Sequence, residues 1–463
     1  MGRMHLLIKN GTVVTAADTF KADVLVDGER IVQIGQELPT DGEALRIIDA
    51  SGKFVLPGGV DPHTHLDSPS RDTTTADDYL TGTIAAACGG TTSIVNFCMQ
   101  QKGKALNEVL DHFAGRARDK AAIDYGFHAM INDLTPAVFE EIAGLPNRGV
   151  TSIKLFMAYR GTNMVDDRTL VRTLDESVRN GILVMVHAEN GDAADLLQQQ
   201  LLQAGKTAPK YHASSRPPRV EAEATARAGA LAEVVNAPVY VVHVSCVEAV
   251  EEIQRARARG VDIMGETCTH YLYFDERDLD RPGFEGAKYV YTPPPRGKHQ
   301  PANMWHAIAG GTLRVVASDH CPYNYHGQKT LGAADFTRIP NGAPGIEERL
   351  MFTYQGVNEG RITLNRFVDL VSTSPAKIFG LYPTKGSVAI GSDADLVIWN
   401  PSAELTVTQS ALHQNVDYTL YEGRRITGIP ETVTLRGEVI VEDRQYVGRP
   451  GTGHFLARKP YGA

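Results

Sequence analysis

Histidine and aspartate side chains stand at the ends of short apolar segments in the middle of the chain. The segments are FVLPGGVDPHTH with His63 and His65, LVMVHAE with His187, PVYVVHVS with His243, and LRVVASDH with Asp319. In an extended segment, residues two apart point to the same side, so His63 and His65 can reach one metal ion. One H-x-H pair is weak evidence, but five such side chains are hard to assign to core packing, because each buried polar group needs a partner. The pattern therefore predicts a metal site.

Lys154 is the unusual member of this set, because it lies inside the apolar segment TSIKLFM. A lysine there is rarely buried unless it is paired, and considered alone it is better interpreted as a snorkelling or salt-bridged lysine. Burial lowers the pKa of a lysine by disfavouring the ammonium form. A neutral amine can react with carbon dioxide to form a carbamate, whose two oxygens and negative charge suit a bridge between two metal ions. We therefore expect Lys154 to act as a metal ligand.

The elements that must position these residues form a regular series. Eight apolar segments are separated by helix-like text such as DDRTLVRTLDESVRN, which is typical of a parallel sheet wrapped by helices. Eight repeats predict an α/β fold, a TIM-like (β/α)8 barrel, whose catalytic residues lie at the C-terminal ends of the strands. The segments are FVLPGGVDPHTH, TTSIVNFC, IDYGFHAMI, TSIKLFM, LVMVHAE, PVYVVHVS, VDIMGETCTHY and LRVVASDH.

Both ends of the chain have a different texture from the middle. LLIKNGTVV and ADVLVDGERIVQIG near the start, and TVTLRGEVIVEDRQYVG near the end, alternate apolar residues with turn signals. We expect these ends to pair into one small β-sandwich domain. The predicted organisation is residues 1–56 for the N-terminal part of the sandwich, 57–384 for the barrel, and 385–463 for the C-terminal part and tail.

Composition and charge exclude several classes of protein. The 463 residues are 42% hydrophobic and 22% charged, as in globular proteins, and the net charge of -9 is not gathered into runs. This balance argues against a nucleic-acid groove or a membrane anchor, and no segment resembles a signal peptide or a membrane span. We therefore expect a cytoplasmic protein with a small-molecule partner.

The five cysteines lack C-x-x-C spacing, which favours reduced, mostly buried thiols. Cys321 lies beside Asp319 and could be mistaken for a nucleophile, but the metal interpretation leaves it no such role.

The motifs PGGVDPHTH, SIKLFMAY, VHAEN, VHVS, SDHCP and IPNG, in this order, resemble those of the amidohydrolase superfamily, in particular its dihydropyrimidinase, D-hydantoinase and phenylhydantoinase branch. The resemblance covers almost the whole chain and includes the closing GHFLARKPY. It implies two divalent metal ions, most simply zinc, bridged by a hydroxide, and usually a homotetramer. The implied ligands are His63, His65, N6-carboxylated Lys154 and Asp319 for one ion, and the same carbamate, His187 and His243 for the other.

The implied reaction is hydrolysis of the cyclic amide bond of hydantoins or dihydropyrimidines, which opens the ring to an N-carbamoyl amino acid. Two dications lower the pKa of a shared water and polarise the amide carbonyl. Asp319 is expected to take the proton during attack and pass it to the leaving ring nitrogen. Tyr159, which follows Lys154 on the next loop, resembles the family tyrosine that donates to the developing oxyanion; on position alone a packing role is equally good.

Four further residues are expected to bind the cyclic ureide. Thr292 in TPPPR and Asn341 in IPNG resemble the family residues whose backbone groups hold the imide edge, although both segments could be ordinary turns. Many relatives have serine at the Thr292 position, an exchange that a backbone contact tolerates. Leu66 and Phe156 are expected to line the side-chain pocket, beside a loop, LDSPSRDTTT, that is more polar than in several relatives.

Two alternative functions share this fold. Dihydroorotases commonly have the motif H-x-H-x-R, in which the arginine binds the substrate carboxylate. Here Asp67 stands at the position of that arginine, which disfavours dihydroorotase or allantoinase activity. Arg71, however, lies nearby in the sequence. A non-catalytic scaffold like the collapsin response mediator proteins would lack most metal ligands, whereas every ligand position is filled here. The same ligands bind zinc, manganese and cobalt.

Overall fold

The computed structural model describes residues 5–40, 45–70 and 73–463, and its centre is an eight-stranded parallel sheet. The sheet closes into a barrel through a bridge between Thr64 and His320, which joins its first and last strands. The predicted (β/α)8 fold is therefore confirmed. The strands are β6 (Gly59–Thr64), β9 (Thr91–Met99), β10 (Asp124–Met130), β11 (Ser152–Phe156), β12 (Leu183–His187), β13 (Val239–Val241), β14 (Ile263–Cys268) and β15 (Val315–Ala317).

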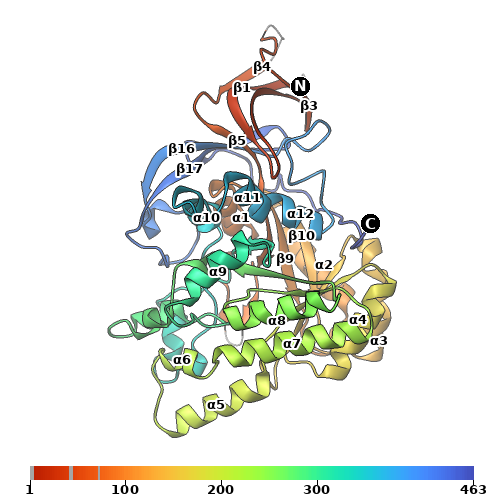
Figure 1. The fold of residues 1–463 in the computed structure, drawn as a ribbon, viewed down its shortest axis with the longest axis vertical. Helices are drawn as coiled ribbons and strands as arrows, with labels where there is room; N and C mark the ends of the chain where they lie inside the picture. The colour runs from red at the N-terminus through yellow and green to blue at the C-terminus, as the bar shows by residue number, and fades with distance from the viewer. Residues whose placement is uncertain (1–4, 41–44, 71–72) are drawn as a thin grey trace.

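Helices surround the barrel (Figure 1). Local sequence fixes where several of them begin: Asp166 caps α4 by accepting from the Thr169 amide, and α7 has proline at its first position. The helices are α1 (Tyr79–Cys88), α2 (Leu106–Ala117), α3 (Pro136–Glu141), α4 (Asp167–Arg179), α5 (Gly191–Gln203), α6 (Tyr211–Ser214), α7 (Pro218–Val234), α8 (Val247–Ala258), α9 (Gln300–Ala309), α10 (Glu348–Asn358), α11 (Leu364–Val368) and α12 (Ser374–Ile378). None of the helices in the described ranges is long and apolar enough to cross a membrane.

The two ends of the chain pair in a separate sheet, which lies above the barrel in Figure 1. Strand β5 joins them, because it pairs with β1 on one side and with β16 on the other. Side chains such as Ile8, Val24 and Ile398 form a core of this sheet's own. Its strands are β1 (His5–Val14), β2 (Thr19–Asp27), β3 (Arg30–Gly35), β4 (Leu45–Asp49), β5 (Phe54–Pro57), β16 (Leu396–Thr406), β17 (Arg425–Leu435), β18 (Glu438–Glu442) and β19 (Gln445–Tyr446).

The segment FVLPGGVDPHTH is two strands rather than the single predicted strand. β5 belongs to the terminal sheet and β6 to the barrel, and the chain passes from one to the other at Gly58. A Cβ atom at Gly58 would lie 2.1 Å from Thr92 Oγ1, so only glycine allows this close approach. The break places His63 and His65 at the end of a barrel strand that is independent of the terminal sheet.

The C-terminal tail covers the N-terminal end of the barrel. The Tyr125 amide at the start of β10 donates to His454 O at 2.9 Å, and the Tyr461 amide donates to Gly181 O, just before β12, at 2.7 Å. Arg458 reaches inward and donates to Ser152 Oγ at 2.8 Å. The opposite, C-terminal end of the barrel therefore remains for function.

Candidate metal centre

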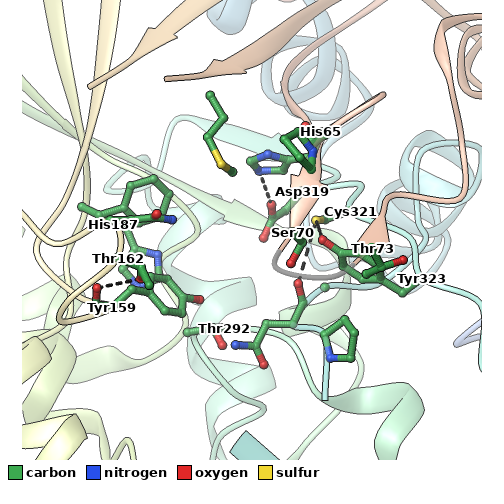
Figure 2. A pocket seen from close by; sticks show the side chains of 18 of the residues that line it. His65, Ser70, Thr73, Tyr159, Thr162, His187, Thr292, Asp319, Cys321 and Tyr323 are labelled. Atoms are coloured by element: carbon green, nitrogen blue, oxygen red, sulfur yellow. Dashed lines mark hydrogen bonds and ion pairs between the residues drawn. The ribbon is translucent and has the colours of Figure 1, made fainter. Parts of the chain in front are cut away.

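A cavity of about 350 Å³ lies at the C-terminal end of the barrel. Figure 2 shows His65 with Asp319, His187 with Tyr159, and Thr292 arranged around it. The structure thus brings together residues from strands and loops far apart in the sequence. The predicted site residues that line the cavity are His63, His65, Lys154, Phe156, Tyr159, His187, His243, Thr292, Asp319 and Asn341.

His63, His65 and Asp319 converge on one point. His63 Nε2 lies 3.0 Å and His65 Nε2 lies 3.3 Å from Asp319 Oδ1. One ligand atom from each of the three residues lies within 4.8 Å of the others, which is compatible with a shared metal ion. Although burial disfavours its charge, the neighbouring histidines hold the pKa of Asp319 well below its ordinary value. The site therefore offers two imidazoles and a carboxylate to a cation.

A buried glutamate orients His63. His63 Nδ1 bonds to the Glu266 carboxylate, and the other carboxylate oxygen accepts from Tyr240 Oη at 2.8 Å. Because Nδ1 is engaged, Nε2 is the nitrogen that faces Asp319. Carboxylates commonly hold metal-ligating histidines in this way, fixing the ring and its tautomer.

His187 has the same kind of support. Its Nε2 bonds to Glu189 Oε2 at 2.7 Å, and that oxygen also accepts from Arg216 Nη1 at 2.7 Å. Burial opposes the charge of Glu189, but Arg216 and His187 lower its pKa to about 2. The ring of His243 packs against that of His187, with centroids 4.6 Å apart. The buried Nδ1 of His243 has no hydrogen-bond partner among the described residues. A second pair of imidazoles thus stands beside the first.

Lys154 lines the same cavity as these two groups of histidines and interacts electrostatically with members of both. Its side chain is buried, and Nζ stands 4.6 Å from the ring centroid of Phe97 and 5.1 Å from that of Phe156. In the described part of the chain its Nζ has no hydrogen bond or ion pair within bonding distance. Burial lowers the pKa of Lys154 to about 8. A deprotonated amine is therefore accessible near neutral pH, and the donor set fits two metal ions that share this residue.

Tyr159 faces the metal centre from the loop that follows β11. Its ring centroid is 5.3 Å from that of His187. Burial raises the pKa of Tyr159 to about 12, so its phenol keeps its proton at neutral pH. This side chain can therefore donate a hydrogen bond to an oxygen in the cavity.

Three cavity residues have left-handed backbones. The φ angle is 67° at Tyr159, 41° at His243 and 47° at Asp319. Such conformations cost roughly 1–3 kcal/mol each for residues with a Cβ, and they persist where the surrounding structure imposes them, commonly at functional sites. Three of the eleven non-glycine residues with positive φ in the described ranges therefore lie at the candidate metal centre.

Leu66 and Asp67 were expected to face the substrate, but neither is among the described residues that line the cavity. Leu66 packs in the core where Gly82 leaves room: a Cβ at Gly82 would be 2.3 Å from Leu66 Cδ2. Asp67, at φ 52°, turns towards α2 and forms an ion pair with Arg116. The predicted pocket role of Leu66 and the argument that Asp67 repels a substrate carboxylate are therefore corrected. Arg71 lies outside the described residues.

Sequence reasoning missed the two supporting carboxylates, Glu189 and Glu266. Both are fully buried, in LVMVHAE and VDIMGETCTHY respectively. An acidic residue inside an apolar strand segment was the available signal, because such a group needs a partner when buried. The cavity also includes Ser68, Ser70 and Thr73 from the polar loop after His65.

The amidohydrolase family profile matches residues 54–426 of the chain. The chain is 56% identical to a D-hydantoinase of Ralstonia pickettii over 99% of this chain and 100% of the relative. It is 40% identical to a D-phenylhydantoinase of Escherichia coli over 99% of both chains. Among solved structures, a D-hydantoinase superposes with a TM-score of 0.97 at 55% identity, covering 99% of this chain and all of the other. An L-hydantoinase (dihydropyrimidinase) from Arthrobacter aurescens gives 0.89 at 30% identity, covering 98% of this chain and 99% of the other.

Proposed function

The chain belongs to the amidohydrolase family, in its hydantoinase and dihydropyrimidinase branch, and we propose that it hydrolyses the cyclic amide bond of hydantoins or dihydropyrimidines to give N-carbamoyl amino acids. One observation carries this proposal: His63 and His65 converge on Asp319 beside a buried lysine that lacks a polar partner in the described residues. The full-length similarity to D-hydantoinases supports the same reaction.

We propose that the site holds two divalent metal ions, with zinc as the first candidate. His63, His65 and Asp319 would hold one ion, His187 and His243 the other, and N6-carboxylated Lys154 both. Burial without a polar partner supports the modification, because it favours the neutral amine that reacts with carbon dioxide. Two such ions, when bound, would supply hydroxide at neutral pH and polarise the amide carbonyl.

The chain's own residues move the proton and hold the ring. Asp319, a carboxylate at neutral pH, accepts the proton released as water attacks and returns it to the departing ring nitrogen. Tyr159 donates a hydrogen bond to the developing oxyanion, which its retained phenolic proton permits. The backbone groups of Thr292 and Asn341 bind the imide edge, and Phe156 packs beside the ring.

The alternatives are not favoured. The relatives described above, which match almost the whole chain, are D-hydantoinases and a D-phenylhydantoinase. A non-catalytic scaffold is disfavoured because all six expected ligand side chains line one cavity.

The direct test of substrate class is a hydrolysis panel with the zinc-loaded protein. It comprises hydantoin, 5-phenylhydantoin, dihydrouracil, dihydroorotate and allantoin, and compares their kcat/KM. We expect the neutral cyclic ureides to be opened best. Dihydroorotate or allantoin as the best substrate would overturn the assignment.

We also propose a homotetramer in the cytoplasm. The family resemblance supports the assembly, and the five cysteines, all free and four of them buried, fit a reducing compartment. Size-exclusion chromatography with light scattering measures the assembly directly.

A further inference from the structure

Lys329 is a second fully buried lysine, located outside the metal ligands. It begins the 3-10 helix η6 (Lys329–Gly332) in the loop between β15 and α10. Its Nζ donates to three backbone oxygens: Val290 O at 2.7 Å, Pro340 O at 2.7 Å and Gly342 O at 2.6 Å. An ammonium group has three N–H donors, so this arrangement satisfies all of them.

The three oxygens belong to the two segments that line the cavity with Thr292 and Asn341. Val290 precedes Thr292 by two residues, and Pro340 and Gly342 flank Asn341. A backbone hydrogen bond from the Gly342 amide to Val290 O, at 3.1 Å, joins the same segments. Lys329 thus adds three hydrogen bonds to this backbone contact, and together they hold the spacing between the two backbone segments that face the cavity.

Burying the ammonium group of Lys329 without a carboxylate partner costs folding free energy, which argues against a purely structural role. No carboxylate pairs with its ammonium among the described residues; the nearby groups are the Cys321 thiol and the Tyr323 ring, whose centroid is 5.9 Å from Nζ. Burial lowers the pKa of Lys329 to about 7. Well-packed apolar side chains often replace buried ionic groups without loss of stability. A lysine here therefore fits a role in geometry better than one in stability.

We propose that Lys329 is a positioning residue for the substrate: it holds the backbone groups of Thr292 and Asn341 at the spacing that the imide edge of a cyclic ureide requires. This inference rests on the proposed function. Without the three hydrogen bonds, the two segments are held mainly by the backbone bond from Gly342 to Val290 and are more mobile, so substrate binding must order them at a free-energy cost. Binding should therefore suffer more than the chemical step.

The test is Lys329→Met in the metal-loaded full-length protein, with Lys385→Met as matched control. Lys385 is also a buried lysine, but it pairs with Asp124 and Asp395 and does not line the cavity. We expect Lys329→Met to raise KM for hydantoin at least about tenfold while kcat changes less than about threefold and metal content stays unchanged. Lys385→Met should lower Tm and leave KM unchanged.

Hydrogen exchange gives a second readout that needs no turnover. The amides of residues 290–292 and those of Asn341 and Gly342 should exchange faster in Lys329→Met than in the unaltered protein, and this should not occur in Lys385→Met. If Lys329→Met fails to fold, Lys329→Gln, which keeps two donors, should show an intermediate rise in KM.

An unchanged KM with unchanged exchange in a folded variant would overturn the proposal. So would equal losses of kcat, metal and binding, because they indicate a general structural role. If the unaltered protein opened none of the five rings of the panel, the proposed function would fail, whereas hydrogen exchange would still decide whether Lys329 holds both segments.

Discussion

His63 Nε2 lies 3.0 Å from Asp319 Oδ1, and this contact joins the first strand of the barrel to the end of the last. The backbone closes at the same place, through the bridge between Thr64 and His320. The candidate metal centre therefore stands at the seam of the barrel. Because a ligand that binds only the folded state stabilises it, metal bound here should also stabilise barrel closure.

Asp319→Asn tests the proton transfer. The amide keeps the shape of the carboxylate but cannot accept the proton, so we expect kcat to fall by about 10²–10⁴. The metal on His187 and His243 should be retained. Steady-state kinetics and metal analysis on one preparation check both points. A loss in kcat of less than about tenfold would rule out the proton-shuttle role.

Tyr159→Phe tests the oxyanion contact. Removal of one such donor typically costs about 10²–10³ in kcat, with little effect on metal content. Tyr323→Phe is a matched control in the same cavity, because the Tyr323 hydroxyl faces Cys321 Sγ at 3.6 Å instead of the metal ligands. Similar kcat values for the two variants would contradict the assignment of Tyr159.

Glu266→Gln tests whether the Glu266 carboxylate orients the His63 ring. The amide replaces the carboxylate that bonds to His63 Nδ1, so the ring is held less firmly in the metal-binding orientation. We expect metal affinity to fall by about 10–100-fold in a protein that still folds. Competition with a chelator measures the affinity. An affinity equal to that of the unaltered protein would show that Glu266 does not support the site.

Glu348→Gln tests a buried acid in α10, away from the metal centre. Burial raises the pKa of Glu348 from 4.5 to about 7. Between these values the folded state keeps a proton that the unfolded state releases, so stability falls as pH rises from about 4.5 to 7. Glutamine should remove this dependence and stabilise the protein at pH 8 by up to about 3 kcal/mol.

Urea unfolding at pH 4.5 and pH 8 measures the effect of Glu348→Gln. The variant and the unaltered protein should have similar stability at the lower pH and differ at the higher. A variant that is less stable at pH 8 would show that Glu348 is stabilising as a carboxylate, through Gln414 and Thr419.

The barrel could be predicted because apolar segments recur regularly along the sequence, and the ligand cluster because its residues stand at the ends of those segments. His187 ends a buried strand and Asp319 closely follows one, and in a parallel barrel the C-terminal ends of all strands meet at one rim. The same reasoning failed just beyond β6. The chain leaves extended geometry after His65, and Asp67 has a φ of 52°, so alternation no longer gives the direction of a side chain.

The residues that support the site were harder to predict. The role of Glu266 depends on strand β14 lying close to His63, with only β15 between β14 and β6, and that of Lys329 depends on carbonyl groups brought together only by tertiary structure. Backbone acceptors leave no signature in side-chain types. Such positioning contacts can therefore be identified only from the three-dimensional structure.

Lys154→Ala tests the central claim, that a lysine-bridged pair of metal ions opens a cyclic amide. Metal content and turnover of hydantoin are measured on the same preparation, with Tm as the check on folding. Because Lys154 is proposed to bridge both ions, we expect bound metal and activity to be lost together while the protein stays folded. A folded variant with a full complement of metal and near-native kcat would contradict the account.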